Sequence, residues 1–317
     1  MRQVELKGNH RKMNIYYDNN YNIDLGLLNY LHPFDGKKFA KVYKVIKNLP
    51  GLVMKSPEQS VPLATIEQLA HPNMREQLKN KRYILAALEV PPIPLLPFWL
   101  VDRRILRPMR WGVAGTIAAA KDALKGNHCW NMSGGYHHAS PGSSEGFCIY
   151  NDIAVAYHDL TTQGLLTSTD KVLIVDIDAH HGNGNAMSFM ENKNVTILDI
   201  YNNDVYPRTL ATKNRVNIGV AMHSGATAAD YLPALEKALH KLDGNYRMAF
   251  VVAGTDVLAT DPLGGMRLTL AECLTRDKMV VEKLHALSIP MVILGGGGYS
   301  KESATAIANS VSALYKY

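Results

Sequence analysis

Short apolar runs alternate with amphipathic stretches along the chain from about residue 110 onward. The apolar runs cover residues 129–132, 171–177, 195–200, 247–254 and 290–295, and all but the first contain Val or Ile. Runs of this length are typical of strands that are buried on both faces of a parallel sheet. The stretches between them have the spacing of amphipathic helices, over residues 111–125, 151–163, 226–242, 271–287 and 302–315. This alternation predicts an α/β fold with a largely parallel central sheet that is flanked by helices.

The N-terminal third follows this pattern less regularly. Residues 36–51 place Phe39, Val42 and Ile46 on one helical face, so we expect a helix whose lysines lie on its other faces. Residues 90–101 hold four prolines among large apolar side chains. Linkers are rarely so apolar, so we interpret these residues as a buried extended segment.

The charge of the chain is unevenly distributed. Its 317 residues are 47% hydrophobic, which is typical of a globular protein and excludes a disordered one. The 34 Lys and Arg residues against 28 Asp and Glu give a net charge of +6, and residues 1–130 hold 20 basic and 10 acidic side chains. A basic excess can indicate nucleic acid or an anionic membrane as partner, but no nucleic-acid motif accompanies it. We therefore interpret it as solvated surface and predict no nucleic-acid partner.

Three cysteines without a CxxC pair make a disulfide framework improbable and favour a reducing compartment. No run of 18 apolar residues is present, so we expect no membrane-spanning helix. Residues 1–12 contain no apolar core of the kind found in secretory signals. Together these features predict a cytoplasmic protein, and no module for targeting to a partner is visible.

Every unusual polar cluster follows the end of a predicted strand. The clusters are NMSGGYHHASPG, DIDAHHGNG, YNNDVYP, GTDVLATDPLGG and GGGGYS. Ligands of open α/β sheets bind outside the carboxyl ends of the strands. The five clusters therefore predict one shared site at that edge.

The cluster after residue 175 has the residue types of a metal site. Asp176, Asp178 and His180 alternate, so they share one face of an extended strand. Asp256 follows another strand and adds a second carboxylate beside Asp178 and His180. Two oxygens and one nitrogen with an open fourth position are typical of a catalytic divalent metal. The alternative is a polar strand end that turns at Gly182.

A metal whose charge is nearly cancelled by two carboxylates acidifies water weakly, so the site needs a separate base and a separate hydrogen-bond donor. His137 and His138 are candidates for the base, and Tyr299, after four glycines, for the donor. The alternatives are a surface loop for the histidines and a packing role for the tyrosine. The glycine run does not fit the nucleotide-binding patterns, so we do not expect a nucleotide ligand.

Taken together, the motifs GGYHHASPGSSEGFCIYNDIAVA, VLIVDIDAHHGNGNA, AGTDVLATDPLGG and LGGGGYS resemble the zinc-dependent histone deacetylase superfamily. The N-terminal segments YYDNNYNI, LHPFDGKKFAKV and PPIPLLPFWLVDRRILRPMRWGVAGTIAAA resemble its class IV branch, the histone deacetylase 11 type. The resemblance implies a three-layer arginase–deacetylase fold and one catalytic domain over residues 1–317.

The resemblance also implies roles for individual residues. Zinc would be bound by Asp178, His180 and Asp256, and His138 would be the general base. His137, paired with Asp176, would assist it, and Tyr299 would donate a hydrogen bond to the oxyanion. Asn183 stands where many relatives carry Asp beside the second histidine, so we expect a lower pKa for His138.

The substrate tunnel and a second ion are implied in the same way. Gly146 and Phe147 match the tunnel wall, and Leu263 matches its rim. The small residues Ser133, Gly134 and Gly135, together with residues 91–100, could shape a deep acyl pocket. The family binds potassium near the zinc, at positions that match Asp176, Asp178, His180, Asp199 and Ile200.

These expectations converge on a hydrolase that removes acetyl or, more in keeping with class IV, long-chain fatty acyl groups from lysine side chains of proteins or peptides. The alternatives are a small-molecule amidohydrolase such as an acetylpolyamine deacetylase, and a non-catalytic acyl-lysine-binding module. Arginase chemistry needs ligands for a second metal, and His181 and Leu258 occupy those positions.

Overall fold

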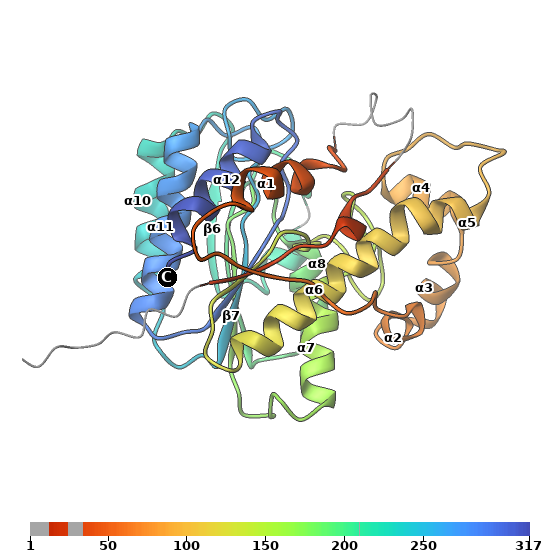
Figure 1. Ribbon diagram of the computed structural model, residues 1–317, viewed down its shortest axis with the longest axis horizontal. Coiled ribbons are helices and arrows are strands. Elements are labelled where there is room, and N and C mark those ends of the chain that lie inside the picture. Colours follow the sequence, from red (N-terminus) through yellow and green to blue (C-terminus); the bar gives the residue numbers. More distant parts are fainter. Residues whose placement is uncertain (1–12, 25–33, 209) are drawn as a thin grey trace, which may run out of the picture.

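The computed structural model describes residues 13–24, 34–208 and 210–317 (Figure 1). Its eight strands form one sheet in which all pairs are parallel, in the order β2-β1-β3-β8-β7-β4-β5-β6. The bounds are β1 Asn14–Tyr16, β2 Val53–Lys55, β3 Cys129–Asn131, β4 Val172–Asp176, β5 Val195–Asn202, β6 Ile218–Met222, β7 Met248–Val252 and β8 Met291–Leu294. The predicted α/β fold with a parallel sheet is confirmed.

Helices cover both faces of this sheet. One face carries α1 Lys38–Ile46, α10 Ala228–Leu239, α11 Leu270–Ala286 and α12 Ser303–Leu314, and the other carries α6 Arg107–Ala123 and α7 Asp152–Thr162 (Figure 1). In β4, Leu173 and Val175 are buried in the core on the first face, whereas Val172 and Ile174 are buried in the core on the second. Both faces of the central strands are therefore dry, which explains their continuous apolar sequence.

Local sequence accounts for the ends of several helices. The Asn151 side chain accepts a hydrogen bond of 2.8 Å from the backbone N–H of Ala154 and caps α7. Thr269 and Glu272 form a capping box at the start of α11. Gly126 follows α6 with a φ of 88°, a conformation that favours glycine. These ends lie within a few residues of the predicted ones.

The N-terminal third adds a lobe at one end of the sheet, on the right in Figure 1. It contains α2 Leu63–Glu67, α3 Pro72–Gln77, α4 Lys81–Ala87 and α5 Phe98–Val101. A π-helical turn, η3 Asp102–Leu106, joins α5 to α6, and Pro108 follows it without an N–H for the regular α-helical ladder. The lobe has an apolar core of its own, which packs against α6. The remaining short elements are η1 Asn19–Tyr21, α8 Asn183–Ser188 and α9 Leu210–Lys213.

The prediction that residues 90–101 form a buried extended segment is wrong. Leu95 is 95% exposed and Trp99 is 62% exposed, and all four prolines of the segment are exposed as well. The Lys81 ammonium donates to the carbonyls of Ile93, Pro94 and Leu96 at 2.8 to 3.2 Å. Prolines provide no N–H groups for a sheet. The backbone of this segment therefore accepts hydrogen bonds from the Lys81 side chain instead of pairing with a strand.

Three features differ from the prediction based on periodicity, and two of them lie in the N-terminal third. The helix expected in residues 36–51 is present as α1, but Lys38 is only 1% exposed, whereas its lysines were expected on the outer faces. The three-residue strands β1 and β2 were not predicted, because they are too short to show a period. β6 was not predicted either, since this edge strand is only partly buried.

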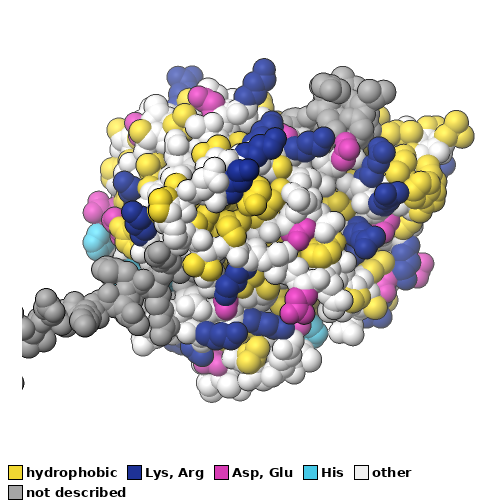
Figure 2. All heavy atoms as spheres, in the orientation of Figure 1, with side chains coloured by type: hydrophobic (Ala, Val, Ile, Leu, Met, Phe, Trp, Pro, Cys, Tyr) yellow, Lys and Arg dark blue, Asp and Glu magenta, His cyan; other side chains and the backbone are white. Residues whose placement is uncertain are grey.

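No helix among the described residues is long and apolar enough to cross a membrane. On the face drawn in Figure 2, Lys and Arg side chains are scattered among acidic and hydrophobic ones and form no continuous stripe. The expectation about a secretory signal concerns residues 1–12 and lies outside the described residues, as do positions 31–33 of the LHPF motif.

Candidate active site

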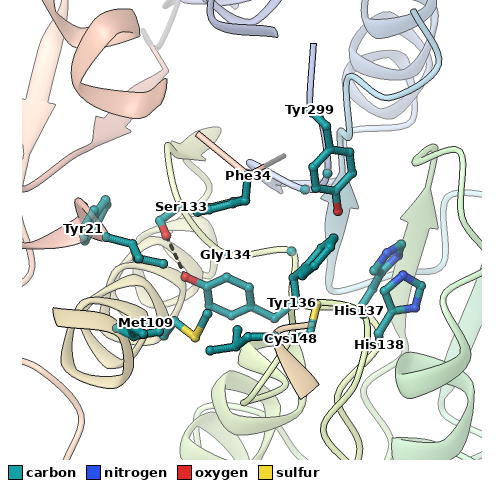
Figure 3. Close-up of a pocket in the computed structure, with 18 of the residues that line it drawn as sticks. Tyr21, Phe34, Met109, Ser133, Gly134, Tyr136, His137, His138, Cys148 and Tyr299 are labelled. Carbon is teal, nitrogen blue, oxygen red and sulfur yellow. Dashed lines mark hydrogen bonds between the residues drawn. The ribbon is translucent and has the colours of Figure 1, made fainter. Parts of the chain in front are cut away.

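The loops that follow β3, β4, β7 and β8 meet at the carboxyl edge of the sheet, as the sequence predicted. Of these loops, those after β3 and β8 line a cavity of about 760 Å³, its open mouth included, together with residues of the N-terminal third. Figure 3 shows His137 and His138 on one side of this cavity, with the Tyr299 hydroxyl directed toward the same side. The loops after β4 and β7 adjoin this lining: the His180 ring lies 5.9 Å from that of His138 and 6.4 Å from that of Tyr299, and Asp256 contacts His180.

Asp178, His180 and Asp256 form a buried group whose potential ligand atoms all lie within 4.8 Å of one another. His180 Nδ1 is 2.7 Å from Asp256 Oδ2 and 3.2 Å from Asp178 Oδ1. Burial alone would lower the pKa of His180, but the two carboxylates raise it well above its usual value. Two carboxylates and one imidazole at this spacing fit a single divalent cation.

Backbone groups orient both carboxylates of this group. The N–H of Gly297 donates to Asp178 Oδ2 at 2.7 Å, and the N–H of Ala179 donates to Asp256 Oδ1 at 2.9 Å. A cation would therefore meet side chains whose rotamers are already set, as in metal sites whose ligands have hydrogen-bonded outer partners.

The loop that carries the two histidines is held by the buried Asp152. Its carboxylate accepts hydrogen bonds from the backbone N–H groups of Gly135 and Tyr136, at 3.1 and 2.9 Å, and from the Thr116 hydroxyl at 2.7 Å. Gly134 and Gly135 both have positive φ, so the chain turns tightly between β3 and His137. Asp152 was not predicted as a site residue; its sequence signal is only its position at the start of a capped helix.

The two adjacent histidines differ in charge. His137 Nδ1 is 2.9 Å from Asp176 Oδ2. Burial opposes a positive charge there, but Asp176 and Asp178 outweigh it and raise the pKa of His137 to about 9. The pKa of His138 is well below its usual value because of burial and of the nearby His137 and His180. His138 is thus neutral near pH 7, as a general base must be.

His138 Nδ1 is 2.7 Å from the side-chain oxygen of Asn183. The predicted lower pKa of His138 agrees in direction with its environment, although burial is the largest cause and the Asn183 hydrogen bond acts the other way. That the pKa of His138 is lower with Asn183 than with an Asp at this position stays a prediction.

The buried Lys38 side chain holds the backbone of the glycine run before Tyr299. Its ammonium donates to the carbonyls of Gly296, Gly297 and Gly298, at 3.1, 3.2 and 3.3 Å. The backbone N–H of Tyr299 donates to Asp261 at 2.7 Å. Burial, followed by the charges of Asp178 and Asp256, raises the pKa of Tyr299 well above its usual value, so its hydroxyl remains a donor.

Gly146 and Phe147 line the cavity, as the resemblance implied, but Leu263 is not among the described residues that line it. A Cβ at Gly146 would collide with the His138 ring, and its φ of 55° also favours glycine. The Phe147 ring lies 5.5 Å from that of Tyr299, and the Tyr206 ring lies 5.1 Å from that of His138. Tyr206 was missed as a site residue, although the YNNDVYP cluster had been placed at this edge.

Away from the two histidines, the cavity wall is largely apolar. Ser133, Gly134 and Gly135 lie along it, and the Ser133 hydroxyl is 2.9 Å from that of Tyr136 (Figure 3). The remaining wall consists of side chains from the N-terminal third, namely Ile23, Phe34, Leu88, Val90, Ile105 and Met109. Residues 91–100 were expected to shape this pocket, but only their neighbour Val90 reaches it.

The buried carboxylate of Asp199 forms a second polar cluster, with His181 and Gly182. Asp199 Oδ2 is 2.6 Å from His181 Nδ1 and accepts a 3.1 Å hydrogen bond from the backbone N–H of Gly182. Asp199 Oδ1 is fully buried and has no hydrogen-bond partner among the described residues. The Ile200 side chain belongs to the apolar core, so only its backbone could face an ion. A buried carboxylate oxygen without a donor is a costly arrangement that a cation would relieve.

The chain is similar to histone deacetylases over nearly its whole length. The sequence profile of the histone deacetylase domain matches residues 32–315. The chain is 34% identical over 307 residues to histone deacetylase 2 of Arabidopsis thaliana, which is 96% of this chain and 79% of that protein. It is 30% identical over 198 residues to histone deacetylase clr6 of Schizosaccharomyces pombe, 59% of this chain and 47% of that protein.

The fold is similar to that in the crystal structure of the HDA15 HD domain, with a TM-score of 0.73 and 21% identity. This similarity covers 96% of this chain and 90% of the other. At this level of identity the likeness concerns the fold alone.

Proposed function

The chain belongs to the histone deacetylase family, and we propose that it is a zinc-dependent hydrolase that removes acyl groups from lysine side-chain amides. The observation that carries this proposal is the buried group of Asp178, His180 and Asp256 beside a cavity that His138 and Tyr299 line. The donor types and their spacing fit zinc with one coordination position left open.

Zinc held by these three side chains would supply Lewis-acid polarisation of the acyl carbonyl and of the attacking water. His138 accepts the proton of that water, because the low pKa of His138 leaves its imidazole neutral. Tyr299 donates a hydrogen bond to the oxygen on which negative charge develops. His137, held by Asp176, carries the positive charge that balances the developing anion. A protonated histidine then returns a proton to the leaving lysine amine.

The cavity supports a preference for long acyl chains over acetyl. The cavity lining extends from His137, His138 and Tyr299 to residues of the N-terminal third. Its wall from the N-terminal third is apolar, so filling it with methylene groups is favourable by about 0.8 kcal/mol for each buried one.

Three finer statements belong to the same proposal. The N-terminal motifs support assignment to class IV, and we treat residues 1–317 as one catalytic domain that acts on acylated lysines of proteins or peptides. The unpartnered oxygen of Asp199 supports potassium at the site that Asp176, Asp178, His180 and Ile200 would complete. The three free, buried cysteines support action in the reducing cytoplasm.

The test combines metal analysis with two substrates. The purified full chain is assayed for zinc and for hydrolysis of one peptide that carries either acetyl-lysine or myristoyl-lysine. We expect one zinc per chain, loss of activity on chelation, recovery with added zinc, and faster hydrolysis of myristoyl-lysine. Asp178→Asn loses zinc and activity, whereas Asp243→Asn, at an exposed aspartate, changes neither. Faster hydrolysis of acetyl-lysine rejects the chain-length preference, and a zinc-free chain without activity on either peptide rejects the function.

A further inference from the structure

The side-chain amide of Asn183 lies between His138 and Glu145. Its oxygen is 2.7 Å from His138 Nδ1, and its nitrogen donates to Glu145 Oε1 at 2.8 Å. Asn183 is 5% exposed and His138 is 4% exposed, so water has little access to this contact, while Glu145 is half-buried. The three side chains form a row that runs from the cavity outward.

The chemistry of Glu145 determines the direction of every hydrogen bond in this row. The two ends of an amide have nearly the same shape, so only their partners decide which end faces which neighbour. A carboxylate only accepts, so the NH2 group of Asn183 faces Glu145 and its oxygen faces His138. His138 Nδ1 therefore carries the hydrogen, and the lone pair of the neutral ring is on Nε2.

We propose that Glu145 is a positioning residue for hydrolysis, because it holds the Asn183 amide in the one orientation that leaves His138 Nε2 free to accept a proton. This inference rests on the proposed function, in which His138 is the base. In the reversed orientation, the amide NH2 would donate to Nδ1, the ring hydrogen would move to Nε2, and the base would have no lone pair for the attacking water.

The surroundings of Glu145 hold its carboxylate in place. Its backbone N–H donates to the carbonyl of Cys148 at 3.1 Å, and its carbonyl accepts from the Cys148 N–H at 2.9 Å. The Ser143 hydroxyl lies 3.3 Å from Glu145 Oε1, and the Tyr206 hydroxyl donates to the same carboxylate. The short loop is thus closed by its own backbone, and a substitution at position 145 changes the carboxylate without releasing the loop.

The dependence on Glu145 follows from the presence of an amide at position 183. A carboxylate there would present an oxygen to His138 in either rotamer, so it would need no outer partner. Asn183→Asp therefore removes the need for Glu145. It also places a second carboxylate at hydrogen-bond distance from Glu145, where two like charges disfavour each other.

The experiment is a double-mutant cycle on the zinc-loaded full chain with myristoyl-lysine peptide. Glu145→Leu should lower kcat about tenfold with KM changed less than twofold. This corresponds to about nine in ten Asn183 amides in the reversed orientation, in which the contribution of the general base, about 10²–10⁴, is lost. Glu145→Gln should retain most of kcat, because its amide oxygen still accepts from Asn183. In the Asn183→Asp background, Glu145→Leu should leave kcat unchanged or raise it, because the repulsion is removed.

A spectroscopic measurement follows the same change without turnover. With 15N-labelled histidine, the wild-type His138 should show its hydrogen on Nδ1, and Glu145→Leu should shift part of the signal to the Nε2 form. His138→Asn identifies the resonance. Glu282→Leu is the matched control, because it removes another carboxylate that accepts a tyrosine hydroxyl, that of Tyr317 at 3.0 Å, far from the cavity; it should change neither kcat nor the His138 signal.

Each result separates the two proposals. If the wild type is active and Glu145→Leu has the same kcat, the role of Glu145 is overturned. The role is also overturned if Glu145→Leu lowers kcat equally in the Asn183 and Asn183→Asp backgrounds. A Glu145→Gln variant as slow as Glu145→Leu overturns it too, because charge rather than amide orientation would then matter. An inactive wild type with zinc bound overturns the proposed function instead.

Discussion

The two ends of the cavity are built from opposite kinds of interaction. The catalytic edge, formed by the loops after β3, β4, β7 and β8, holds polar side chains that specific hydrogen-bond partners orient, such as Asp178 with Gly297 or His137 with Asp176. The acyl wall, formed by Ile23, Phe34, Leu88, Val90, Ile105 and Met109, presents apolar side chains from the N-terminal third. In the proposed function, chemistry comes from one region of the chain and the shape of the substrate pocket from another.

This difference decides how each region responds to substitution. Hydrogen bonds at the catalytic edge are directional, and an unpaired buried polar group costs about 1–3 kcal/mol, so loss of a single atom has a large effect there. The acyl wall depends on volume, so changes of similar size are tolerated and only a change in the space available is felt. The same comparison predicts effects on rate at one end and on substrate choice at the other.

Among variants that keep the candidate metal ligands, the largest effect expected within the catalytic edge is that of Tyr299→Phe. Loss of the hydroxyl removes one hydrogen-bond donor to the oxyanion, which should lower kcat by about 10²–10³ for acetyl and myristoyl peptides alike. Zinc content should stay at the wild-type level. Near-normal turnover in this variant would show that Tyr299 has no such role.

Lys38 belongs to the N-terminal third but contacts the glycine run of the catalytic edge. Substitutions of Lys38 therefore test whether the two regions act independently. Lys38→Met leaves the carbonyls of Gly296, Gly297 and Gly298 without their donor, so Tyr299 loses its support. We expect kcat to fall about tenfold or more, for both acyl lengths, with zinc retained. Lys38→Arg should restore much of the rate, because a guanidinium also donates to carbonyls. A Lys38→Met variant with unchanged kcat would separate the two regions completely.

Val90→Phe should change substrate choice without changing the chemistry. The larger ring occupies space in the acyl wall, so we expect kcat/KM for myristoyl-lysine to fall about tenfold while that for acetyl-lysine stays within about twofold. Leu95→Ala, at the nearby exposed position, should alter neither value. Equal losses on both peptides would mean that Val90 supports the catalytic edge rather than the acyl wall.

The smallest effect is expected where the N-terminal strands join α6. The buried Asp122 carboxylate accepts hydrogen bonds from Asn14, Tyr16 and Lys55 in β1 and β2, at 2.9, 2.8 and 2.5 Å. Burial by itself would raise the pKa of Asp122, but these donors outweigh it and lower the pKa below its usual 3.8. A lowered pKa stabilises the fold above pH 3.8, and this stabilisation is lost as the pH falls through the folded-state pKa.

Asp122→Asn should therefore destabilise the protein by about 1–2 kcal/mol at pH 7, and its stability should fall less than that of the wild type between pH 5 and pH 3. Urea unfolding at pH 7, 5 and 3 measures both values. Turnover of acetyl-lysine should be unchanged, because Asp122 is remote from the catalytic edge. Parallel pH profiles for the two proteins would contradict the assignment.

The sequence predicted the catalytic half of the molecule well, because its signals are local. Buried strands such as β4 are continuous apolar runs, and a polar cluster after each strand is enough to place Asp178, His180 and Asp256 at one edge. The N-terminal third was predicted less well, since three-residue strands have no period and residues 91–100 are apolar yet exposed.

By itself, the sequence determined the α/β architecture, the edge of the sheet where the polar clusters meet, and the residue types of the candidate metal group. Only the tertiary structure decided which neighbours complete that site. Lys38 reaches the glycine run from 258 residues away in the chain, and Glu145 meets Asn183 across 38 residues. Periodicity reports which face of an element is buried, but it does not report what lies opposite, and the direction of a hydrogen bond depends on that opposite partner.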